Sequence, residues 1–212
     1  MQNTMIYVAA AGIGMIANTV NADDLTPPSW RGNPGTTVQH WDFNSGPNGQ
    51  LPDALPLNNP FGTPIMNSMF GSWMPAFGGR NDVWDISAGH LEFEVPNSGM
   101  ATHTKELWLQ VTYFGGAAPA IGPGVSIAGP TGPFTLLNTS TMSIGNGWFH
   151  ELTQWSVGQC PQWERVTVTP SQVGVITVID QVVIDTYCKV PTPGSLALLG
   201  LGGLCAARRR RH

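Results

Sequence analysis

Apolar and polar residues alternate along much of the middle of the chain. Over residues 90–95, Leu91, Phe93 and Val95 alternate with polar neighbours, and residues 105–114 repeat the pattern. A period of two places successive side chains on opposite faces of a β-strand. Both segments therefore predict half-buried strands.

The same reasoning extends over the region between residues 23 and 189. Strands are also predicted at 36–43, 83–86, 134–143, 147–157, 164–169 and 174–187. Residues 51–79 and 115–133 are rich in Pro and Gly and predict long loops, the first with one short strand. No segment of this region offers about ten residues of helical periodicity with caps. Roughly eight to ten short strands predict an all-β, two-sheet, jelly-roll-like β-sandwich, with two neighbouring hairpin domains as the alternative.

The N-terminus carries a signal of a different kind. Residues 5–17 form an uncharged apolar run, and Val20 and Ala22 place small residues at the two positions that a signal peptidase reads. This predicts a signal peptide with a helical apolar segment over residues 1–22 and a mature chain from Asp23. No Lys or Arg precedes Arg31, so the usual basic start is missing. A buried N-terminal helix is the alternative.

The C-terminus reads as a sorting tail over residues 190–212. A breaker motif comes first, then the uncharged run 194–207, then a basic cluster. The run predicts a short hydrophobic helix, although it is shorter than the ~20 residues that span a bilayer squarely. The arginines should stay cytoplasmic, which directs the domain outward. An amphipathic core helix does not fit, because the run has no polar face. The motif is Val190, Pro191, Thr192, Pro193 and Gly194, and the basic stop is Arg208, Arg209, Arg210 and Arg211.

This three-part order resembles the PEP-CTERM sorting tail of Gram-negative bacteria, with Thr192 where the family pattern has Glu. The resemblance implies export, transient anchoring in the inner membrane and processing by an exosortase-type enzyme. The final location would be the cell surface or the medium. The layout also resembles exported planctomycete-type proteins with this tail. Residues 179–188 resemble the closing strand of galactose-binding-like jelly rolls.

Charge and cysteines agree with export of residues 23–189. All 13 acidic residues precede the tail, whereas four of the nine basic residues belong to it, so the domain is more acidic than the chain's net charge of −4. Such a domain is a poor nucleic-acid binder. In an oxidising compartment Cys160 and Cys188 are expected to form a disulfide, with two free thiols as the alternative. Cys205 is interpreted as an apolar residue within the lipid bilayer, with lipidation of its thiol as the alternative.

Motifs for catalysis are not apparent. The sequence contains no HExxH, CxxC or GxSxG pattern and no phosphate loop. Glu92 and Glu94 share a strand face, as paired carboxylates of a glycosidase would, but exposed glutamates on a solvated strand are commoner. No catalytic residue and no cofactor are therefore expected.

A structural Ca²⁺ site is a weak candidate near the turn at 45–49. Side-chain oxygens gather there, although turn-forming Asx residues explain them equally well. The four residues are Asp42, Asn44, Asn48 and Asp53.

Aromatic residues provide the remaining functional signal, because exposed Trp rings can stack on sugars. All eight Trp lie in the domain. Trp73 and Trp163, in Pro-containing stretches, are the candidates for a glycan-binding rim, with core packing as the alternative for each Trp. Three functions remain open: a non-enzymatic surface or exopolysaccharide-matrix protein that binds glycans weakly, a secreted polysaccharide-active hydrolase, and a structural filler without a ligand.

Overall fold

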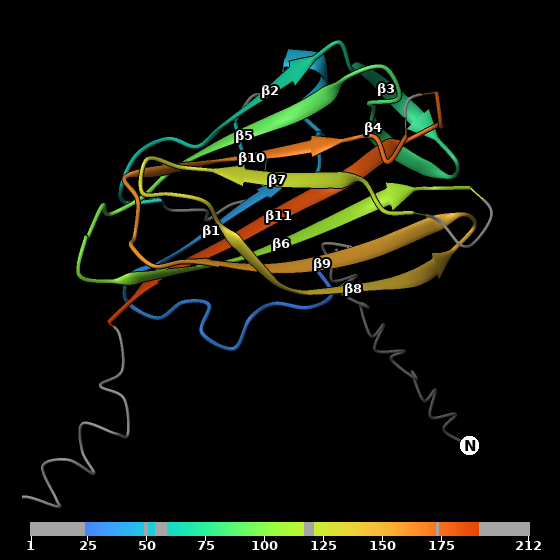
Figure 1. Cartoon of the computed structure of the whole chain (residues 1–212). Helices are drawn as coiled ribbons and strands as arrows, with labels where there is room; N and C mark the ends of the chain where they lie inside the picture. Colours follow the sequence, from blue (N-terminus) through green and yellow to red (C-terminus); the bar gives the residue numbers. More distant parts are fainter. Residues whose placement is uncertain (1–23, 49–50, 54–58, 117–120, 173, 191–212) are drawn as a thin grey trace, which may run out of the picture.

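The computed structural model describes residues 24–48, 51–53, 59–116, 121–172 and 174–190. These residues form an all-β sandwich of two antiparallel sheets (Figure 1). The elements are β1 (Thr36–Trp41), the 3₁₀ helix η1 (Gly46–Asn48), β2 (Ile65–Met69), β3 (Ser72–Phe77), β4 (Arg80–Asp85), β5 (His90–Pro96), β6 (Thr104–Phe114), β7 (Gly124–Ala128), β8 (Thr135–Gly145), β9 (Trp148–Val157), β10 (Trp163–Thr169) and β11 (Val178–Lys189).

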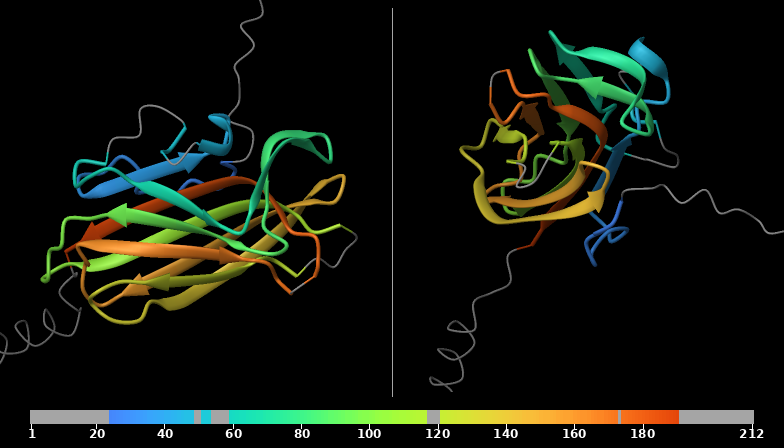
Figure 2. Two further views of the ribbon diagram at one scale, coloured as in Figure 1. Left: turned by 90° about the horizontal axis from the view of Figure 1, so that it is seen from above. Right: turned by 90° about the vertical axis from the view of Figure 1, so that its right-hand side faces the viewer.

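The larger sheet has seven strands and is organised around β11. Six strands follow the order β3-β4-β11-β6-β9-β8. β6 pairs along one edge of β11, whereas the other edge is shared by β4 at its start and β1 further on. The smaller sheet has the order β2-β5-β10-β7. Seen along the strands, the two sheets wrap around a common interior (Figure 2).

The core lies between the sheets and follows the predicted alternation. Leu91, Phe93 and Val95 of β5 face Leu107 and Leu109 of β6 in one buried cluster. These five side chains have an exposed fraction of 0%, so each contributes fully to the hydrophobic stabilisation of the core. A second cluster, built from Val83, Trp148 and Val178, packs on the opposite face of the larger sheet.

Two hairpins of the larger sheet are closed by turns that need positive φ. Asn146 and Gly147 join β8 to β9 with φ of 54° and 80°, and Gly78 and Gly79 join β3 to β4 with φ of 56° and 84°. Two consecutive residues with positive φ form the type I′ turn, whose twist matches antiparallel strands and favours Asn-Gly and Gly-Gly.

Three strands lie where the sequence predicts mainly loop. The region 51–79 contains both β2 and β3, and the region 115–133 contains β7. All three are edge strands, so each has a neighbour on one side only. Pro75 lies within β3, which an edge strand tolerates because one row of its N–H groups needs no partner. Because an edge strand is only partly covered, its sequence need not alternate strictly between apolar and polar residues, and the strand predictions depended on that alternation.

The segment before β1 is fixed to the outer face of the larger sheet. Arg31 donates two hydrogen bonds to the Asp185 carboxylate, at 2.5 and 2.6 Å, and also contacts Asp24. Gln110 donates to Asp24 at 2.8 Å. Trp30 packs on Trp108 with 6.1 Å between ring centroids. Trp108 therefore points away from the core, as the alternation over residues 105–114 predicts.

Candidate functional site

The predicted terminal signals lie almost entirely outside the described residues. This holds for the signal segment 1–22, for Pro191, Thr192, Pro193 and Gly194, and for Arg208–Arg211. Val190 is the last described residue, is 69% exposed and directly follows β11. In the described part of the chain, no helix has the length and apolar character needed to cross a membrane.

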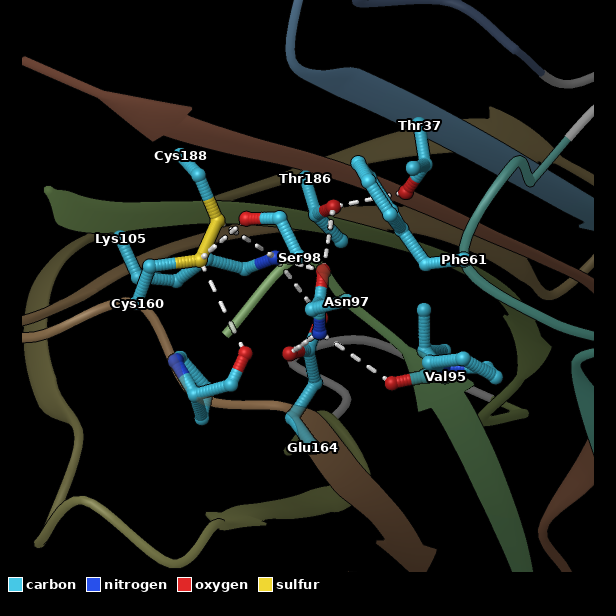
Figure 3. A network of polar contacts seen from close by, with 12 residues as sticks. Thr37, Phe61, Val95, Asn97, Ser98, Lys105, Cys160, Glu164, Thr186 and Cys188 are labelled. Carbon is cyan, nitrogen blue, oxygen red and sulfur yellow. Dashed lines mark hydrogen bonds and ion pairs between the residues drawn. A yellow bond between two sulfur atoms is a disulfide. The ribbon is translucent and has the colours of Figure 1, made fainter. Parts of the chain in front are cut away.

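The predicted disulfide is confirmed. Cys160 and Cys188 are bonded, and their Cα atoms lie 5.6 Å apart, within the usual range for a disulfide. Cys188 belongs to β11 of the larger sheet, and Cys160 precedes β10 of the smaller sheet. The bond therefore links the end of the last strand to the connection between β9 of the larger sheet and β10 of the smaller sheet (Figure 3).

A buried polar cluster lies beside this disulfide. Lys105 Nζ is 3.2 Å from Glu164 Oε1, and both side chains are 0% exposed. Asn97, 7% exposed, lies between them: Lys105 Nζ contacts Asn97 Oδ1, and Asn97 Nδ2 contacts Glu164 Oε2. Figure 3 shows the three side chains converging next to the sulfur atoms. We call Asn97, Lys105 and Glu164 the buried triad.

Two threonines extend the triad toward β1. Thr186 Oγ1 donates a hydrogen bond to Asn97 Oδ1 at 3.3 Å, and Thr37 Oγ1 lies 2.7 Å from Thr186 Oγ1. Both threonines are buried. The carboxamide oxygen of Asn97 is therefore held from two sides, by the lysine and by a hydroxyl.

Burial moves both charged members of the triad toward their neutral forms. Burial raises the pKa of Glu164 to about 7, against the opposing effect of Lys105. Burial likewise lowers the pKa of Lys105, and Glu164 partly offsets this. An amine and a carboxyl group that share one proton at low dielectric can pass it between them at little cost.

The sequence contains a signal for the triad that motif searching missed. Lys105 falls on the same strand face as Leu107 and Leu109, and Glu164 shares its face with Val166 and Val168. A charged residue on the apolar face of a strand is rare unless it is paired. Opposite charges on the apolar faces of two strands point to a buried pair between them.

The two candidate tryptophans have different surroundings. Trp73 lies in β3, packs half-buried against the main core and donates its indole N–H to Phe43 O at 3.3 Å. Trp163 begins β10 and is 42% exposed. Trp163 is therefore the one of the two that offers an accessible ring.

The two carboxylates of the candidate Ca²⁺ site have partners within the protein. Asp42 accepts a hydrogen bond from Gln181 at 2.6 Å and lies 3.0 Å from His40 Nε2. Asp53 accepts from the Ser45 hydroxyl at 2.5 Å. Asn44 and Asn48 are exposed. Among the described residues, no group of three or more His, Cys, Asp or Glu side chains is arranged to hold a metal ion.

Glu92 and Glu94 lie on the solvent face of β5, as their alternation predicts. Glu94 pairs with Arg165 of the neighbouring β10, and Glu92 lies 3.5 Å from His90 Nε2. One hollow, at the end of the sandwich near Tyr113 and Ile176, encloses about 150 Å³. This is well below the ~300–1,000 Å³ of typical ligand sites.

Together these contacts define an all-β sandwich in which a buried polar triad connects the two sheets beside a disulfide that ties down the last strand. Comparison with known proteins identifies no relative: no protein-family model matches the chain, and neither the curated proteins nor the solved structures contain a detectable match.

Proposed function

We propose that this chain is an exported, non-enzymatic protein of the cell surface or of an exopolysaccharide matrix, with its sandwich as a structural module. The sandwich is proposed to be of the jelly-roll type, which agrees with strands that cross repeatedly from one sheet to the other. The leader 1–22 directs export, and the tail 190–212 holds the chain in the inner membrane until an exosortase-type enzyme processes it.

The observation that carries this proposal is the Cys160–Cys188 disulfide between β11 and the connection of β9 to β10. Structural disulfides persist in oxidising compartments and are rare in the cytosol. A chain that carries one between an apolar N-terminal run and a basic C-terminal cluster fits the exported side of a membrane.

A structural role is further supported by the ion pairs of the basic residues. Every Lys and Arg of the described residues forms an ion pair with a carboxylate, and these pairs connect different segments of the fold. The basic residues are Arg31, Arg80, Lys105, Arg165 and Lys189. Weak glycan binding through the exposed ring of Trp163 is part of the proposal.

Cell fractionation tests the export route. The full chain is produced in a Gram-negative host that has an exosortase, beside a variant ending at Val190. The full chain should occur in the membrane fraction and then at the surface, whereas the truncated variant should be periplasmic or secreted and retain a cooperative melt. Replacing Arg208–Arg211 with Gln serves as the matched control for the basic stop. An insoluble truncated chain, or a full chain retained in the cytoplasm with free thiols, would contradict the proposal.

A further inference from the structure

We propose that the buried triad is the site of an autocatalytic isopeptide bond, formed between Lys105 Nζ and the side-chain carbonyl carbon of Asn97 with Glu164 as proton carrier. The product is a secondary amide between two side chains, and ammonia is released. The bond would join β6 of the larger sheet to the segment that follows β5 of the smaller sheet.

The three groups required for this chemistry are in contact. The nucleophile Lys105 Nζ touches the Asn97 carboxamide at Oδ1. One oxygen of Glu164 lies 3.2 Å from the lysine nitrogen, and the other touches the Asn97 amide nitrogen that would leave. A carboxyl group placed between attacking and leaving nitrogens is positioned to move a proton from one to the other.

The surroundings of Lys105 and Glu164 favour the protonation states that the reaction requires. A lysine attacks only as the neutral amine, and burial lowers the pKa of Lys105 while it raises that of Glu164 to about 7. Thr186 donates to Asn97 Oδ1, where negative charge develops when the amine adds. Because the side chains are fixed inside a packed interior, the reaction is effectively unimolecular, which favours it strongly over the same step in solution.

The step balances without an oxidant or a reductant. Starting from neutral lysine and protonated Glu164, the Nζ–Cγ bond forms and the Cγ–Nδ2 bond breaks. Nζ gives one proton to Glu164, and Glu164 gives one proton to the departing nitrogen. The products are one amide, one molecule of ammonia and an unchanged Glu164.

Peptide mass spectrometry of the oxidised, folded full chain tests the bond. After denaturation, reduction and alkylation, trypsin should fail to cleave after Lys105 and should release residues 81–165 as one peptide. That peptide should be lighter than its sequence by one ammonia, about 17 Da. Cleavage after Lys105 together with the full sequence mass would overturn the proposal.

Variants separate the roles of the three residues. Lys105→Met, Asn97→Ala and Glu164→Gln should each restore the full sequence mass of the region. Lys189→Met is the matched control, because Lys189 is the other lysine of the chain and forms its ion pair at the surface, and it should keep the ammonia loss. Asn97→Asp should lose water instead and reach the same product mass as the wild type.

Refolding of the wild type keeps the test independent of variants that fail to fold. Chain purified in denaturant before it has folded should have the full sequence mass and should lose ammonia only after refolding, also in the presence of a reductant. Loss of ammonia in denaturant, or none after a cooperative fold has returned, would contradict an autocatalytic bond.

Discussion

Reduction of the Cys160–Cys188 disulfide should lower the stability of the sandwich markedly. The bonded cysteines are separated by 28 positions. Closing a loop of that length removes chain entropy from the unfolded state equivalent to about 3–4 kcal/mol at 25 °C. In a domain of this size each kcal/mol shifts Tm by roughly 2–4 °C, so the reduced protein should melt roughly 6–16 °C lower.

Thermal melts followed by circular dichroism, with and without a phosphine reductant, measure this difference. Cys160→Ala/Cys188→Ala should reproduce the reduced value, because both sulfur atoms are buried and no new polar group is introduced. Cys205→Ala is the matched control and should leave Tm unchanged. The loop 160–188 does not include Asn97 or Lys105, so a bond between those residues does not alter the expected change. A shift of less than about 2 °C would refute the reasoning from loop entropy.

Two further predictions concern single side chains. Burial raises the pKa of Asp185 to about 6, and Arg31 only partly offsets this. A carboxyl group whose pKa is higher in the folded chain than in the unfolded chain stabilises the fold at low pH, and this contribution is lost as the pH rises through the folded pKa. In urea unfolding, the wild type should therefore lose stability relative to Asp185→Asn between pH ~4 and ~6, and the opposite trend would show that the Arg31 pair dominates. On a glycan array, Trp163→Ala should weaken any binding with little change in Tm, whereas Trp73→Ala should lower Tm because its ring packs on the core. Equal binding by the Trp163 variant would exclude that ring as the contact.

Much of the sandwich was predictable because core strands such as β5 and β6 place apolar residues on one face and mostly polar residues on the other. β5 and β6 alternate cleanly, and the prediction placed both close to their observed bounds. The edge strands β2, β3 and β7 were less predictable, because partial cover does not require strict alternation. The hydrophobic pattern thus identifies the strands that build the core more readily than those at its margins.

The candidate sites were less predictable, because pairing depends on contacts between distant strands. The disulfide was predictable from the two cysteines of the domain and the expected oxidising compartment. For the buried triad, the charges of Lys105 and Glu164 on apolar strand faces are a signal in the sequence. The contact with Asn97 is not, since Asn97 and Glu164 meet only when β5 and β10 pair. Likewise, the bond from Arg31 to Asp185 spans 154 positions. No local motif encodes either contact.

The position of the covalent links suits a protein held by its C-terminus. β11 ends at Lys189, directly before the proposed tail in the sequence, so a load on the proposed anchor would enter the sheet at Lys189. β11 is hydrogen-bonded to β6 along most of its length and to β1 and β4 on its other edge. One residue before Lys189, the disulfide at Cys188 transfers part of the load to the connection between β9 and β10. An amide between Lys105 and Asn97 would add a second link between the sheets at the same end, beside the register pair Cys188 and Lys105. Peeling β11 from the sandwich requires breaking the disulfide as well as the hydrogen-bond ladder, which is the resistance that the proposed anchored surface module needs.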